Sequence, residues 1–144
     1  MIGRLPMLEL NKNLLKAALV DNSRTNTMKA LRVPGVYVES EDEESGQTVM
    51  MRAAAMGWDE IITMLLQKHA KIDGRSKDGW TPLMLAIYNG HEPAAKTLID
   101  AGATLTDDDV QKLMEFSETM GDTPGSDYSG SLLYDIMKIL KKKK

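Results

Sequence analysis

The fold of this chain is decided by residues 79–105, which read GWTPLMLAIYNGHEPAAKTLIDAGATL. The same pattern occurs 33 residues earlier, over residues 46–72, as GQTVMMRAAAMGWDEIITMLLQKHAKI. A fixed period of this length indicates stacked units, each of which buries one face against a neighbour. Seven positions are identical in the two copies: Gly46/Gly79, Thr48/Thr81, Met51/Met84, Ala53/Ala86, Gly57/Gly90, Leu65/Leu98 and Ala70/Ala103.

The stretch Thr81-Pro82-Leu83-Met84-Leu85-Ala86, followed by Gly90-His91 and Ala101-Gly102-Ala103, resembles the ankyrin repeat. That family has a period of about 33 residues and the signature Thr-Pro-Leu-His-x-Ala. The resemblance implies an all-α, ankyrin-type helical solenoid of about four helix-pair repeats with finger turns, and divergent capping repeats at both ends. It also implies a non-catalytic protein–protein interaction module that binds through a concave face, formed by the fingers and the first helices.

In this register the whole chain, residues 1–144, is a single ankyrin-repeat domain. We expect an N-terminal capping repeat at 11–45, repeats at 46–78 and 79–105, and a divergent C-terminal cap at 106–140. Divergence at the ends is expected because terminal units of a solenoid need a polar outer face. The predicted helices cover residues 11–20, 24–31, 49–56, 59–68, 82–89, 92–101, 108 to 118 or 120, and 131–140.

Three local departures from the signature carry physical expectations. Met51 and Met84 stand where the family has a His that ties the helix start to the neighbouring finger. His69 stands where the next unit has Gly102, so we expect it in the left-handed region at a cost of roughly 1 kcal/mol. Thr106, followed by three aspartates, is typical of a helix N-cap. The residues that recur in phase are predicted to be buried: Ala53, Ala86, Leu65, Leu98, Ile62 and Leu83.

Composition argues against an enzyme and against several classes of partner. The chain has a net charge of −3, no cysteine and only two histidines, and it contains no nucleotide-binding or nucleophile-elbow motif. A mild basic excess in residues 1–37 is offset by the acids of residues 39–44, so neither nucleic acid nor a membrane is expected as a partner. No cofactor and no metal are predicted. We expect a cytoplasmic monomer, with the nucleus as the alternative location.

Two charged runs leave alternatives open. Residues 39–45, Glu-Ser-Glu-Asp-Glu-Glu-Ser, form the first finger in this register. The spacing of these acids does not match a calcium loop. We therefore interpret the run as a solvated loop or as a docking patch for a basic partner. The run Lys141–Lys144 reads as a solvated helix end, with a nuclear address or an anionic-surface contact as alternatives.

The resemblance places the partner-contacting positions around the finger glycine and at the end of the first helix of each unit. Trp, Tyr and Arg are the residue types that carry most binding energy at interfaces, which supports this choice. The alternative is that Trp80 covers its own finger and Tyr88 packs between units. The predicted contact residues are Lys77, Asp78, Trp80, Tyr88 and Asn89 of unit three, Glu44, Gln47 and Met56 of unit two, and Arg75 on the finger between them.

The identity of the protein partner is unknown, and two hypotheses describe what the chain does to it. In the first, the chain is an adaptor or scaffold that tethers its partner. In the second, it is an inhibitor or immunity-type protein that occludes an enzyme. We expect the adaptor or scaffold, with the inhibitor as the alternative.

Overall fold

The computed structural model describes residues 23–33, 36, 38–39, 41, 44–119 and 135–139, and it is an all-α solenoid over this part of the chain. Its helices are α2 (Arg24–Leu31), α3 (Val49–Met56), α4 (Asp59–Gln67), α5 (Pro82–Tyr88), α6 (Glu92–Asp100) and α7 (Asp107–Thr119). Residues 135–139 are also helical. The ends of α2 to α7 lie within one or two residues of the predicted helix ends, and residues 135–139 lie inside the helix predicted at 131–140. The predicted helix at 11–20, the long loop after α7 and the lysine run lie outside the described residues.

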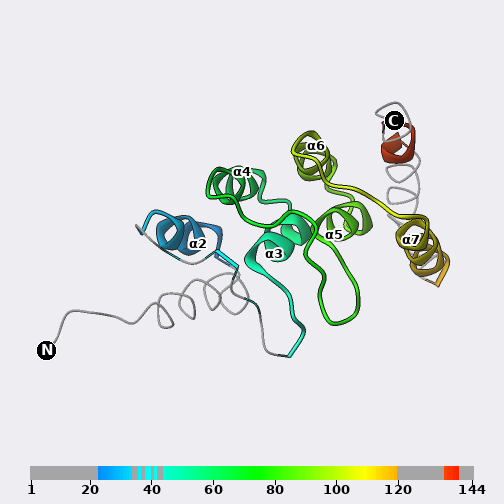
Figure 1. Cartoon of the computed structure of the whole chain (residues 1–144), viewed down its shortest axis with the longest axis horizontal. Coiled ribbons are helices and arrows are strands. Elements are labelled where there is room, and N and C mark those ends of the chain that lie inside the picture. The colour runs from blue at the N-terminus through cyan, green and yellow to red at the C-terminus, as the bar shows by residue number, and fades with distance from the viewer. Residues whose placement is uncertain are drawn as a thin grey trace, which may run out of the picture.

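The helices form two layers (Figure 1). Helices α3, α5 and α7 lie in one layer, and α2, α4 and α6 lie in the other. Neighbours within each layer pack together, α3 on α5, α5 on α7 and α4 on α6, and the two helices of each central unit also pack on each other. The loop between α4 and α5 projects from the α3 and α5 side as a finger, so the first helices and the fingers share one face. We call this face the inner face.

The first helix of each repeated unit begins after a threonine that recurs at a spacing of 33 residues. The Thr48 hydroxyl accepts from the Met51 N–H, and the Thr81 hydroxyl from the Met84 N–H, each at 3.2 Å. Gly57 ends α3 in the left-handed region at φ 72°. His69 adopts φ 63°, which confirms the strained position predicted for it. The shared caps therefore fix both units in the same register.

The core runs between the two layers, and the prediction of its members is confirmed. Each of the six recurring positions, Ala53, Ala86, Leu65, Leu98, Ile62 and Leu83, is fully buried. Met51 and Met84 are also fully buried. The methionines that replace the signature His thus act as core side chains, for which a flexible thioether is well suited.

We expect any side chain at Gly57 to destabilise the fold, both because its backbone is left-handed and because His91 packs against it. A Cβ at Gly57 would lie 2.7 Å from Nδ1 of His91, which stands at the start of α6. Gly57→Ala should lower the free energy of unfolding by at least about 1 kcal/mol, measured by urea denaturation. The cost should shrink in a His91→Ala background, where the ring is gone. An equal cost in both backgrounds would contradict the contact with the ring and leave only backbone strain.

Candidate partner-binding site

The structure brings two of the predicted contact residues together and spreads the others along the inner face. Trp80 and Tyr88 are half-buried, and their ring centroids lie 5.6 Å apart. Asn89 and Met56 are exposed at the ends of α5 and α3. The remaining predicted contacts lie on the fingers, where Glu44, Arg75, Lys77 and Asp78 are exposed and Gln47 is half-buried. The site assignment as a whole remains a prediction.

A third aromatic ring, Phe116 of α7, completes a group that we call the aromatic cluster: Trp80, Tyr88 and Phe116. The Phe116 centroid lies 5.1 Å from that of Trp80 and 6.2 Å from that of Tyr88. All three pairs meet edge to face, which is a favourable geometry for aromatic rings. Phe116 is 41% exposed, whereas the other two rings pack partly against the core. Trp80 and Tyr88 therefore anchor the cluster to the core, and Phe116 presents it to solvent.

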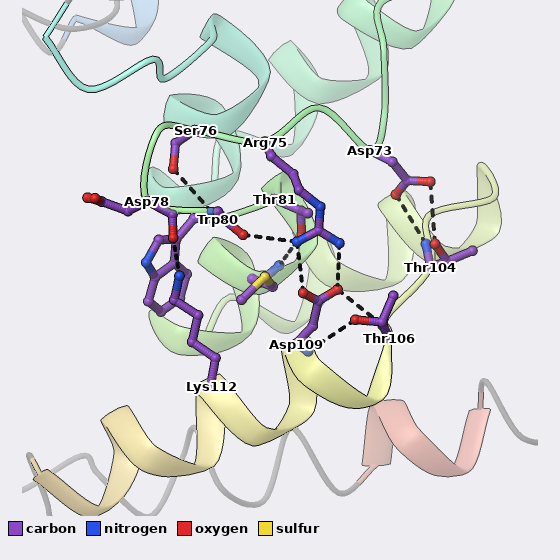
Figure 2. A network of polar contacts seen from close by, with 12 residues as sticks. Asp73, Arg75, Ser76, Asp78, Trp80, Thr81, Thr104, Thr106, Asp109 and Lys112 are labelled. Atoms are coloured by element: carbon purple, nitrogen blue, oxygen red, sulfur yellow. Dashed lines mark hydrogen bonds and ion pairs between the residues drawn. The ribbon is translucent and has the colours of Figure 1, made fainter.

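Lys112, one turn before Phe116 on α7, lies against the same cluster. Its ammonium nitrogen is 5.3 Å from the centroid of the Trp80 ring and donates to the main-chain oxygen of Asp78 (Figure 2). A cation in this position is attracted by the negative face of the indole. Among the described residues, none of the carboxylates forms an ion pair with Lys112.

The finger that carries Trp80 is fastened to α7 by an ion pair. The Arg75 guanidinium donates to both carboxylate oxygens of Asp109, at 2.9 and 3.1 Å, and to the Gly79 carbonyl at 3.0 Å. Asp109 is only 4% exposed. The Thr106 hydroxyl in turn accepts from the Asp109 N–H at 3.1 Å, which confirms the predicted N-cap. Arg75 was predicted to contact a partner, but its guanidinium is held by the chain's own residues (Figure 2).

The pKa values of this pair are shifted in the directions that stabilise its charged form. The hydrogen bond to Asp109 raises the pKa of Arg75 above its ordinary value. Burial alone would raise the pKa of Asp109, but the hydrogen bonds from Arg75 and Thr106 outweigh burial and hold that pKa below its ordinary value. The pair is therefore ionised at neutral pH.

Adjacent fingers are also tied to one another. The Lys77 N–H donates to the Ser45 carbonyl at 2.9 Å, and the Lys71 N–H donates to a Glu39 carboxylate oxygen at 2.7 Å. On the other side, Asp73 accepts from the Thr104 N–H at 3.3 Å. Glu39 is thus a structural tie between fingers, which neither interpretation of the acidic loop included. Residues 40, 42 and 43 of that loop lie outside the described residues.

Sequence reasoning missed Phe116, which belongs to the aromatic cluster, and Lys112, which lies against it. The 33-residue register aligns Phe116 with the core residue Leu83, so it gives no hint of an exposed ring. In the structure α7 begins right after Thr106, only 25 residues beyond the equivalent cap Thr81, and it is 13 residues long where α5 has 7. Phe116 belongs to this additional length. A helical pattern read from Thr106 would have placed Lys112 and Phe116 on one face, since they are four residues apart.

Comparison with known proteins identifies the family. A model for ankyrin repeats, in three copies, matches residues 14–109, which is two thirds of the chain. The chain belongs to the ankyrin-repeat family, whose repeats are generic protein–protein interaction modules and are typically non-catalytic.

Several curated proteins share the repeat segment. Human M-phase phosphoprotein 8 is 35% identical over 74 residues, which is 51% of this chain and 9% of that protein. Mouse protein phosphatase 1 regulatory subunit 12A is 32% identical over 89 residues, 62% of this chain and 8% of that protein. Mouse ankyrin repeat and SAM domain-containing protein 6 is 41% identical over 59 residues, 40% of this chain and 7% of that protein. The chain therefore spans less than a tenth of the length of each of these relatives.

The described residues contain no metal-binding cluster and no membrane-spanning helix. None of their His, Asp and Glu side chains gather into a group that could hold a metal ion. Over the same residues, the helices are too short or too polar to cross a membrane.

Proposed function

We propose that this chain is an adaptor that binds a partner protein through its inner face, with the aromatic cluster at the centre of the contact. The observation that carries the proposal is the exposed Phe116 ring, which stands on two half-buried aromatic rings. Large aromatic side chains surrounded by a polar rim are typical of the residues that dominate binding energy. Met56 and Asn89 extend the same face along α3 and α5.

The ties around the cluster support this proposal. Arg75, Asp109 and Lys112 hold the finger against α7, so the Trp80 ring has few conformations to lose when a partner binds. A surface that is already ordered binds at a smaller entropic cost than a mobile one. In this view Arg75 contributes by positioning the finger, whether or not it also touches the partner.

The proposal includes no catalysis, metal or cofactor. His91 packs beside Gly57, where its ring is part of the contact between units, and His69 occupies the strained helix end. Neither arrangement pairs a nucleophile with a base, which acyl or phosphoryl transfer by side chains would require. We further propose a monomer that acts in the cytoplasm or the nucleus.

Substitution of the exposed ring tests the binding face most cleanly. Phe116→Ala should weaken binding of a captured partner by about 1–2 kcal/mol, and Trp80→Ala and Tyr88→Ala by at least as much. Binding would be measured by titration calorimetry against a partner isolated from host cells by affinity capture and mass spectrometry. Lys68→Ala, at the exposed end of α4, is the matched control on the other layer. Unchanged affinity in all three aromatic variants would exclude the inner face.

The activity of the captured partner separates tethering from occlusion. An adaptor should leave the turnover of an enzyme partner unchanged in the complex. A loss of turnover that is restored by Phe116→Ala would instead show an inhibitor that covers the active site.

A further inference from the structure

We propose that the partner segment bound by the aromatic cluster carries a single carboxylate three or four residues from a bulky apolar side chain on a helix. The carboxylate would pair with Lys112 while the apolar side chain packs on Phe116. This inference rests on the proposed function and specifies the chemistry of the partner at that same site.

The first step in the argument is the state of the Lys112 charge. The ammonium is half-buried, and its described neighbours are a neutral main-chain carbonyl and the face of an aromatic ring. Figure 2 shows the Asp78 carboxylate directed away from it. An ammonium has three donors, and the carbonyl of Asp78 accepts one hydrogen bond. A cation that forms no ion pair with the described carboxylates is well complemented by an anion from a partner.

The second step is the contrast with the other cation beside the cluster. Arg75 lies on the same finger, but both oxygens of the buried Asp109 neutralise it. Lys112, by contrast, lies 5.3 Å from the centroid of the Trp80 ring and forms no ion pair among the described residues. A partner carboxylate would gain more from Lys112 than from Arg75, because it need not break an existing ion pair.

The third step is spacing. Lys112 and Phe116 are four residues apart on α7, so their side chains lie on one face of the helix, one turn from each other. A partner helix with an acidic and an apolar residue three or four positions apart presents both groups on one face in the same way. One such helix can satisfy the charge and cover the ring together.

The fourth step limits the number of acids. Three carboxylates of the chain stand near this site: Asp78 on the finger, two residues before Trp80, and Asp108 and Glu115 on α7, four residues before and three residues after Lys112. A partner segment with an acidic run would be repelled by these nearby carboxylates, whereas an isolated carboxylate gains the local contact with Lys112 at a smaller cost. The expected segment is therefore mainly apolar and polar, with one Asp or Glu beside its anchor.

A display library of helical peptides tests this directly. The library would vary the positions around one fixed Leu or Trp and would be selected on the folded chain, without any natural partner. Selected peptides should be enriched in Asp or Glu three or four positions from the anchor. Lys112→Met should weaken a synthetic selected peptide about three- to tenfold, Lys112→Arg should retain most of the affinity, and Lys68→Met should leave it unchanged. Replacing the peptide's acid with its amide should cost nothing further in the Lys112→Met variant.

The outcomes separate this inference from the proposed function. Peptides that bind in a Phe116-dependent manner but lack an enriched acid, or that ignore Lys112→Met, would overturn the inference and leave the binding face standing. Selected peptides that bind equally well to Phe116→Ala would overturn both. Analytical ultracentrifugation of the free chain tests whether a second copy of the chain occupies the cluster. A dimer that dissociates on Phe116→Ala substitution would show that it does, which would also overturn the inference.

Discussion

Leu98→Ala is expected to lower the free energy of unfolding by about 2–5 kcal/mol, the largest effect of any single substitution proposed for this chain. Leu98 of α6 is fully buried, and its counterpart Leu65 of α4 is buried to the same degree. Removing three side-chain carbons from such a site loses their transfer free energy and leaves a cavity that close-packed neighbours fill only in part. Leu65→Ala should fall in the same range. Urea denaturation followed by far-ultraviolet circular dichroism gives both values.

Met114→Ala provides the control for this prediction. Met114 lies on α7 and is 47% exposed, so its truncation should cost less than about 1 kcal/mol. If Leu65→Ala and Leu98→Ala also each cost less than about 1 kcal/mol, these two leucines are not in the core, and α4 and α6 bury a different face.

The two central units could be predicted closely because the capping residues, the glycine at a helix end and the apolar spacing all indicate the same helices. Thr48 and Thr81 cap their helices, glycine ends α3 in the left-handed region, and the apolar residues repeat with the same period. Such local signals are short-range and act within one unit, so a single sequence reveals them. His69 shows the strength of the register: the repeat predicted a left-handed residue there even though the residue is not glycine.

Helix α7 of the last unit was predicted close to its observed bounds, but its contacts could not be predicted from the period, because the period breaks there. The fourth unit lacks the residues that would form another finger, and α7 starts where that finger would stand. Side chains of α7 then take over the contacts that a neighbouring finger makes elsewhere: Lys112 bonds to the Asp78 carbonyl, as the Lys77 N–H bonds to Ser45 on the other side. The aromatic cluster follows from this substitution of a helix for a finger, and residue types alone do not reveal it.

Arg75 illustrates a different limit. Its type and its place on a finger favoured a partner contact, but its bond partner Asp109 lies 34 residues further along the chain. Ion pairs over such separations depend on the stacking of units, which the sequence indicates only in outline. Asp109 itself was read as one of three acids at a helix start, and only the structure singles it out as the buried one.

The Arg75–Asp109 pair should carry the second-largest effect on stability. Asp109→Asn and Arg75→Met should each lower the free energy of unfolding by about 1.5–3 kcal/mol, the range for hydrogen bonds to charged groups. The Arg75 side chain is 46% exposed, which places the expected values toward the lower end. Because each substitution removes the same pair, the double variant should cost less than the sum of the two, as a double-mutant cycle would measure.

The pH dependence of unfolding distinguishes this pair from ordinary packing. The pKa of Asp109 is lower in the folded chain than the value of about 3.9 for an unfolded aspartate. Its contribution to stability is therefore complete above that unfolded value and is lost as the pH falls through the folded pKa, where the carboxylate takes up a proton. Urea denaturation at pH 7 and in steps below pH 4 should show a steeper acid loss for the wild type than for Asp109→Asn. Parallel profiles for the two proteins would mean that Asp109 titrates normally, and the ion pair would then not fasten the finger to α7.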